Sequence, residues 1–301
     1  MSIRRSKSHC LPWLSSVVVV FLLLLPSARA ELLAFYTFDD PAAPLADSSG
    51  NNRDLTGTAG TNPVWGADSG FDGTGAYDFS NDRLIAPIDV NPGVMNKMTW
   101  GGWVRTDDLS AGLRKIMGHD NGGWDRTIGL DNRSGSFRYT TFTGIGRPVV
   151  GSPGPANTTD WTFVAAAHDQ SAGTVTFYVD LDASTTDEPL QSFTEPATFG
   201  SGWGTFAIGG LRPDSASEAW DGAIDNIFIY DEFLDLAAVT ELRDAFGIGQ
   251  APRINSFSAS PGFIDSGQGT TLSWDVRGAE SLSIDMGAPP VSGETGSVMV
   301  S

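Results

Sequence analysis

The chain has 301 residues, with 18 Lys and Arg against 36 Asp and Glu, so its formal net charge at pH 7 is −18. Such a negative field repels nucleic acid and anionic membrane surfaces and attracts cations. The single cysteine, Cys10, excludes a disulfide within the chain. Stability therefore has to come from an apolar core, a metal or a partner.

The N-terminus has the order of a secretory signal peptide. Basic residues within 4–7 precede an apolar run over 17–25, and the small side chains of Ala28 and Ala30 follow. The run is about half the length that a membrane-spanning helix needs. We therefore expect residues 1–30 to be removed and the protein to be secreted or held at the cell surface. An uncleaved anchor is the alternative. Cleavage would remove four basic and no acidic residues, which takes the net charge from −18 to −22.

Short β-rich runs alternate with Gly, Ser, Thr, Asn and Asp, the pattern of an all-β sandwich or barrel. In the run 174–179, Val175, Phe177 and Val179 alternate with polar residues, which predicts one packed face and one face in water. Only 235–246 has helical spacing, with Asp235 as its cap. Strands are predicted over 32–38, 83–88, 98–106, 126–130, 136–142, 161–168, 174–179, 205–208 and 223–230.

The sequence changes character after Gly249. A linker is predicted over 250–253, and in the segment that follows Leu272 and Trp274 share one face of a strand. The stretches 254–261 and 271–276 are similar to the immunoglobulin-like repeats of bacterial surface proteins, which act as spacers. Such a sandwich needs about seven strands. Because fewer are visible, we expect 254–301 to be an incomplete domain of a longer protein.

Four motifs follow one another in a fixed order along the chain. They occupy 33–40 with 47–52, then 98–104, then 161–165 running into 175–180, and finally 220–231 before the short helix. Together they resemble the laminin-G-like, or concanavalin-like, jelly-roll superfamily over residues 32–246, and we assign 31–249 to this domain. The resemblance implies a two-sheet antiparallel jelly roll that binds sugars or proteins, often with one calcium ion. Fold does not identify the ligand.

Catalytic patterns are missing from the sequence. A hydrolase of this fold would need two carboxylates about 5–5.5 Å apart on one strand face, and no strand has that spacing. His119 and His168 are too few for zinc. The acidic residues within 180–188 are interpreted as a solvated hairpin turn. We predict a non-catalytic binding module for an extracellular glycan or protein. The alternatives are a polysaccharide hydrolase or lyase with scattered active residues and a purely structural adhesion repeat.

One calcium site is predicted where the two ends of the domain meet. Asp39 ends the first strand, and Asp225 lies near the start of the last one, on the face of the isoleucines that follow it. A charge in such a stripe is costly unless it is paired or bound to a metal. Asp47, Gly50 and Asn52 add oxygen donors of the kind that calcium selects. The alternative is that Asp39 and Asp47 cap turns and Asp225 pairs with an arginine.

Two tryptophans are predicted to bind ligand. Trp124 and Trp203 lie in the glycine-rich segments 119–125 and 200–204 rather than in alternating strands. An exposed indole in such a loop offers a stacking surface for a sugar ring or an anchor for a protein. The alternative is that each ring covers the edge of the core.

Overall fold

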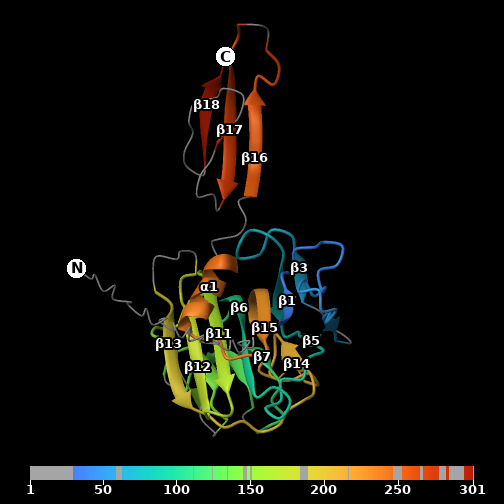
Figure 1. Ribbon diagram of the computed structural model, residues 1–301, viewed down its shortest axis with the longest axis vertical. Helices are drawn as coiled ribbons and strands as arrows, with labels where there is room; N and C mark the ends of the chain where they lie inside the picture. The colour runs from blue at the N-terminus through green and yellow to red at the C-terminus, as the bar shows by residue number, and fades with distance from the viewer. Residues whose placement is uncertain are drawn as a thin grey trace, which may run out of the picture.

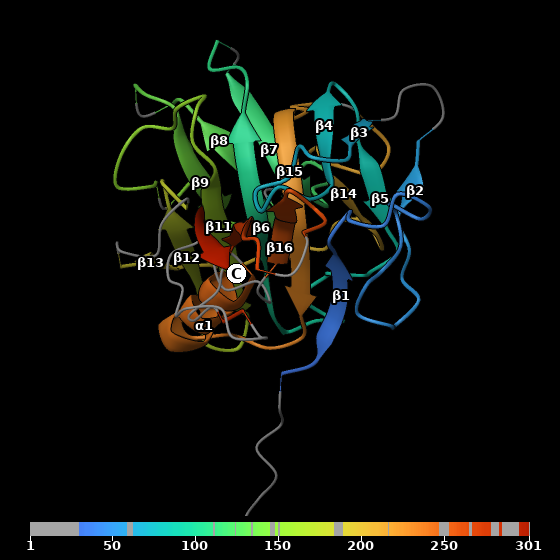
Figure 2. The ribbon, with the colours of Figure 1, turned by 90° about the horizontal axis from the view of Figure 1, so that it is seen from above.

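The computed structural model describes residues 30–58, 63–110, 112–123, 125–133, 135–144, 148–149, 151–183, 189–215, 217–246, 253–264, 267–277, 283–284 and 295–300. Strands from the larger part of the chain form two facing antiparallel sheets, with one short helix on the outside (Figures 1 and 2). The predicted all-β sandwich is confirmed. The predicted signal segment lies outside the described residues except for Ala30.

The first sheet contains β1 (Leu32–Tyr36), β3 (Val64–Gly66), β4 (Ala76–Ser80), β6 (Lys97–Thr106), β11 (Thr162–Asp169), β12 (Thr174–Asp180), β13 (Gln191–Pro196) and β15 (Asp221–Tyr230). Its order is β13-β12-β11-β6-β15-β4-β3, and β1 also pairs with β15. The second sheet contains β2 (Thr56–Gly57), β5 (Leu84–Ala86), β7 (Leu113–Gly118), β8 (Thr127–Asp131), β9 (Arg138–Phe142), β10 (Pro148–Val149) and β14 (Phe206–Ile208). Its order is β10-β9-β8-β7-β14-β5-β2.

The first sheet is apolar on both faces. Trp100 packs into the core between the sheets, whereas Trp103, three residues further along β6, packs into a second apolar layer on the outer face. Helix α1 (Leu236–Phe246) covers that layer with Val239 and Leu242. Burying side chains on both sides of one sheet extends the hydrophobic stabilisation that a chain without disulfides depends on.

The prediction of a wet face on β12 is therefore wrong. Val175, Phe177 and Val179 enter the core as expected, but Tyr178 on the other face is 1% exposed. Its hydroxyl donates a hydrogen bond of 2.8 Å to the carbonyl of Leu234, just before α1. The helix itself begins as predicted, because the Asp235 carboxylate accepts a 3.0 Å hydrogen bond from a first-turn amide.

Several strands carry too little periodicity to be predicted, and β7 illustrates the reason. Its Lys115 is fully buried, with the ammonium 3.9 Å from the Phe142 ring centroid and 3.7 Å from Glu218. Burial lowers the pKa of this lysine to about 8. Gly129 lies opposite Lys115 on the neighbouring strand β8, where a side chain would come within 2.9 Å of the lysine side chain, so glycine provides the room. Because a charged residue occupies this buried position, the apolar pattern of β7 is interrupted and the sequence does not indicate a buried strand.

The third sheet is separate from the sandwich sheets and contains β16 (Arg253–Ser260), β17 (Thr270–Arg277) and β18 (Thr295–Val300) in that order. Trp274 is buried in it, whereas Phe257, Phe263 and Met299 are exposed. The immunoglobulin-like assignment of this segment stays a prediction. Within the part of the chain that is described, no helix has the length and apolarity to cross a membrane.

Candidate functional site

The first and last strands of the sandwich are neighbours. β1 pairs antiparallel with β15, with Phe35 opposite Phe228 and Tyr36 opposite Ile227. The expectation that the two ends of the domain meet is confirmed, and Figure 2 shows the pair seen from above.

Asp225 does not share a face with the isoleucines that follow it, so that prediction is wrong. The pairing of β15 with β6 shifts between Asp225 and Phe228, and Asn226 within the shift has a φ of 49°. This bulge exchanges the faces of the strand. Asp225 lies opposite Trp103 and therefore on the outer face, whereas Ile227 points into the core.

Asp225 is fully buried among other carboxylates. Its Oδ2 accepts a hydrogen bond of 2.9 Å from the Phe71 amide, and its Oδ1 is buried without a hydrogen-bond partner. Burial raises the pKa of Asp225 well above its ordinary value, and the negative charges of Asp72 and Asp39 add to the effect. Asp39 is brought close by the same loop, because its Oδ1 accepts a hydrogen bond of 3.2 Å from the Gly75 amide.

The oxygens around Asp225 have some features of a cation site but lack a complete set of ligand side chains. A side chain on Gly70 would meet Asp225 Oδ2 at 2.7 Å and the carbonyl oxygens of Gly75 and Thr74 at 2.9 and 3.0 Å, so three hard oxygens converge beside it. Even so, among the residues that the structure describes no three His, Cys, Asp or Glu side chains form a closed metal-binding group. Sequence reasoning missed Asp72 because the glycine-rich stretch around it has the composition of an ordinary turn.

Asp47 performs a different task. Its Oδ1 accepts hydrogen bonds of 3.0 Å from the amides of Phe35 and Ser49, and its Oδ2 accepts one of 3.0 Å from the backbone amide of Arg53. Burial alone would raise the pKa of Asp47, but these hydrogen bonds outweigh it and lower the pKa. The carboxylate thus holds a turn against the outer edge of β1, as the turn-capping alternative proposed.

Gly50 and Asn52 lie in the turn that Asp47 organises. Both are exposed and adopt left-handed backbone conformations, with φ of 84° and 58°. The same turn covers the edge of β1, because the side chain of Asn51 donates a 2.8 Å hydrogen bond to the Leu32 carbonyl. The structure therefore brings Asp39 and Asp225 together with Asp72 and gives the Asp47 turn a structural role of its own.

The loop of Trp203 lies against the loop that follows β7. The Trp203 amide donates to the His119 carbonyl at 3.0 Å, and the Asn121 side chain donates to the Ser201 carbonyl at 2.8 Å. Trp203 is 38% exposed. Trp124 lies outside the described residues, but its loop is the one that Asn121 ties to the Trp203 loop. The two glycine-rich segments singled out in the sequence are thus neighbours in space.

A buried arginine supports the same end of the sandwich. Arg126 is fully buried, and one guanidinium nitrogen donates hydrogen bonds of 2.8 Å to the carbonyls of both Val90 and Met95. Burial lowers its pKa to about 10. His119 and His168 are buried nearby rather than arranged for metal binding, and burial lowers the pKa of His119 to about 4.

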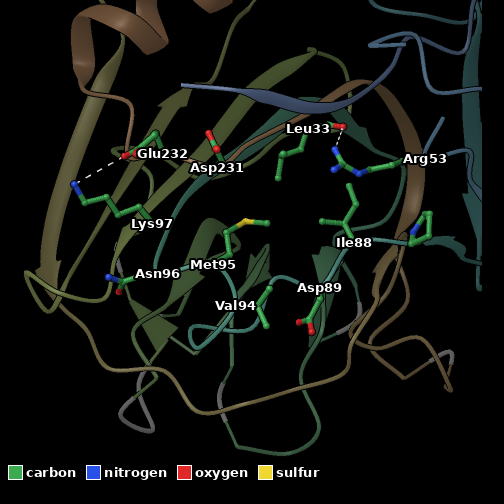
Figure 3. A pocket seen from close by; sticks show the side chains of 11 residues that line it. Leu33, Arg53, Ile88, Asp89, Val94, Met95, Asn96, Lys97, Asp231 and Glu232 are labelled. Carbon is green, nitrogen blue, oxygen red and sulfur yellow. Dashed lines mark hydrogen bonds and ion pairs between the residues drawn. The ribbon is translucent and has the colours of Figure 1, made fainter. Parts of the chain in front are cut away.

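A groove of about 590 Å³ opens beside these loops (Figure 3). Its walls come from β1, the start of β6 and the segments that follow β5 and β15. No periodic pattern connects residues so far apart in the sequence, so sequence reasoning missed the groove. It is lined by Leu33, Arg53, Pro87, Ile88, Asp89, Val94, Met95, Asn96, Lys97, Asp231 and Glu232.

The interpretation of 180–188 as a solvated turn is wrong for Asp180. This residue is 6% exposed, and its carboxylate lies 2.7 Å from the guanidinium of Arg243 on α1, which is also buried. The pair attaches the helix to the sheet. Asp187 and Glu188 lie outside the described residues.

Comparisons with known proteins agree with this architecture. A sequence profile described as the concanavalin A-like lectin/glucanases superfamily matches residues 80–240, more than half of the chain. Comparison with curated proteins found no match.

Solved structures of other proteins share the fold. Domain 4 of AbnA, a GH43 extracellular arabinanase from Geobacillus stearothermophilus in complex with arabinotriose, is 22% identical with a TM-score of 0.51, over 71% of this chain and 99% of that one. The binding domain of Paraclostridial Mosquitocidal Protein 1 is 14% identical with a TM-score of 0.52, over 71% of this chain and 52% of that one. The binding domain of botulinum neurotoxin DC in complex with SialylT is 11% identical with a TM-score of 0.50, over 89% and 70%. At these identities the likeness shows the fold alone, and this chain spans about half of the mosquitocidal binding domain.

Proposed function

The chain belongs to the concanavalin A-like lectin/glucanases superfamily, and we propose that within it this protein is a non-catalytic module that binds an extracellular glycan or protein. The observation that carries the proposal is the exposed indole of Trp203, on a loop held by hydrogen bonds to two others. A rigid, partly exposed aromatic ring loses little entropy when it binds. The arabinotriose bound to the arabinanase domain and the SialylT bound to the neurotoxin domain support glycan binding on this fold.

Binding by the full chain to glycan and protein arrays tests this proposal. Trp203→Ala and Trp124→Ala should each weaken binding by about 1–3 kcal/mol, the cost of losing an aromatic anchor. Phe263→Ala is the matched control, because Phe263 is 97% exposed but belongs to the third-sheet segment. A fall in melting temperature with unchanged binding would assign the tryptophan to the core instead.

The rival function is an extracellular polysaccharide hydrolase or lyase. It is less well supported, because three buried carboxylates have structural partners: Asp47 with amides, Asp180 with Arg243, and Asp225 with the Phe71 amide. Assays for turnover on polysaccharides decide between the two. Release of reducing ends by the wild type would contradict a purely binding role. If that release survives loss of Asp225 and of Asp180, other residues carry the catalysis.

The proposal includes one stabilising calcium ion at the meeting point of β1 and β15. Asp39 and Asp225 would hold it with the carbonyl oxygens of Thr74 and Gly75, and Asp47, Gly50 and Asn52 would keep the adjoining turn in place. A cation would offset the mutual repulsion of these carboxylates and satisfy the free oxygen of Asp225.

Calorimetry tests the calcium proposal. Ligand at about a hundred times its Kd should add about 2.7 kcal/mol to the free energy of unfolding. Asp225→Ala should abolish this gain, whereas Asp182→Ala, on an exposed residue after β12, should leave it intact. Equal melting temperatures in calcium and in chelator would refute the site.

We propose further that the protein is exported and acts outside the cell, with residues 254–301 as an immunoglobulin-like spacer. The signal pattern before Ala30 and the acidic composition support this location. N-terminal sequencing should find Glu31 as the first residue. Recovery of membrane-bound protein that retains residues 1–30 would show that the apolar run is an anchor.

A further inference from the structure

The groove and the Trp203 loop are attached to the same turn. Asn91 donates from its side-chain nitrogen to the Trp203 carbonyl at 3.0 Å and accepts from the Gly202 amide at 2.6 Å. Asp89, two residues earlier, lines the groove and accepts a 3.0 Å hydrogen bond from the Asn91 amide. The Trp203 loop and the groove therefore adjoin through the turn that contains Asp89 and Asn91.

The wall of the groove is held rigidly from behind. Arg126 is buried and bonds the carbonyls of Val90 and Met95, which fixes the turn between them. Met95 and Val94 from that turn line the groove. A wall fixed before binding loses little conformational entropy when a ligand arrives.

The lining combines aliphatic and hydrogen-bonding groups. Leu33, Ile88 and Val94 supply apolar surface, and Figure 3 shows Asp231 and Glu232 across the groove from Asp89. Carboxylates accept hydrogen bonds from hydroxyl groups, and Asp89, Asp231 and Glu232 supply them to the lining. A volume of about 590 Å³ is within the range of ligand pockets, about 300–1,000 Å³. These features suit several sugar units rather than a single small ion.

The charge of the groove favours a neutral ligand. Both cations of the lining are engaged: Lys97 lies 3.8 Å from Asp169 and 3.9 Å from Glu232, and Arg53 bonds the Leu33 carbonyl. Carboxylates outnumber cations in the lining, and the chain as a whole carries −18. Acidic sugars would approach against this field.

We propose that the groove and the Trp203 ring form one extended site for a neutral, hydroxyl-rich glycan, with one sugar stacked on Trp203 and the following sugars in the groove. This inference rests on the proposed binding function and names its ligand class. Among the described residues, the groove lining contains no aromatic ring, so Trp203 supplies the stacking surface and the carboxylates supply the hydrogen bonds.

Titration calorimetry on the full chain with three ligand panels tests the site: neutral oligosaccharides of two to six units, uronate-containing oligosaccharides, and mixed-charge peptides. Val94→Arg places a long side chain in the groove at a residue that is 68% exposed, so the fold should tolerate it. Val64→Arg is the matched control, on β3 at a residue that is 70% exposed and outside the lining.

We expect the longer neutral oligosaccharides to bind, with Val94→Arg and Trp203→Ala each weakening affinity at least tenfold and Val64→Arg leaving it unchanged. If Trp203→Ala weakens glycan binding and Val94→Arg does not, the groove is refuted while the proposed function stands. Tighter binding of uronates, or groove-dependent binding of peptides alone, overturns the neutral-glycan assignment. If no glycan or peptide binds, the proposed function fails with it.

Discussion

Two carboxylates that lie near β1 show how environment separates equal side chains. Asp47 is saturated by three backbone amides, and its pKa is lowered. Asp225 accepts a hydrogen bond from a single amide and is buried beside Asp72 and Asp39, and this environment raises its pKa. The first therefore stabilises the fold as an anion, whereas the second destabilises it unless a cation or a proton is present. Sequence reasoning placed both in a single calcium site, and the structure assigns them opposite electrostatic roles.

A third buried carboxylate, Asp180, is paired with a full positive charge, so substitution of its partner should give the largest loss of stability among the three. Arg243→Ala should lower the free energy of unfolding by about 3–5 kcal/mol, since it leaves Asp180 buried and unpaired. Chemical denaturation measures the loss. Arg243→Met together with Asp180→Leu should recover much of the stability. If the single substitution costs under about 1 kcal/mol, the pair is not buried in solution.

Asp47→Ala should have the next largest effect, a loss of about 2–3 kcal/mol, because three amide hydrogen bonds to a charged group disappear and the edge of β1 is uncovered. Hydrogen exchange should show faster exchange at the Phe35 amide. Asp40→Ala is the control, because Asp40 is exposed and caps only a local turn. Equal effects of the two substitutions would contradict the edge-capping role.

In the presence of chelator, Asp225→Asn should not lower the free energy of unfolding, in contrast to the two substitutions above. The amide retains an acceptor for Phe71 and removes the buried charge, so the variant should be as stable as the wild type or more stable at neutral pH. With calcium the order should reverse, because only the wild type gains stability. Thermal melts in both conditions measure the difference. A variant that is less stable than the wild type in chelator would contradict the repulsion.

The contributions of Asp225 and Asp47 to stability should change in opposite directions with pH. Because the pKa of Asp225 is raised, its contribution in chelator should fall as pH rises above about 4 toward the folded-state pKa. Because the pKa of Asp47 is lowered, its contribution is present above about 4 and is lost as pH falls through the folded-state pKa. Melting curves of the wild type, Asp225→Asn and Asp47→Asn between pH 3 and 7, in chelator, separate the two slopes. Parallel curves for the three proteins would refute the assignment.

Much of the fold could be predicted because local patterns carry it. Alternation identified most long strands, Asp235 identified the start of the helix, and the adjacency of first and last strands followed from the family resemblance. The wet face expected for β12 was wrong because helix α1 supplies a second apolar layer that no property of the strand itself reveals.

For the candidate site, the sequence by itself determined composition: an acidic chain, glycine-rich loops with tryptophans, and carboxylates near the ends of the domain. Only the tertiary structure decided what those groups do. The bulge at Asn226 turns Asp225 to the outer face, the loop with Asp72 closes over it, and the amides around Asp47 use its oxygens. The groove likewise joins segments from Leu33 to Glu232. Hydrogen bonding and burial depend on neighbours far away in the chain, and sequence periodicity describes only the neighbours nearby.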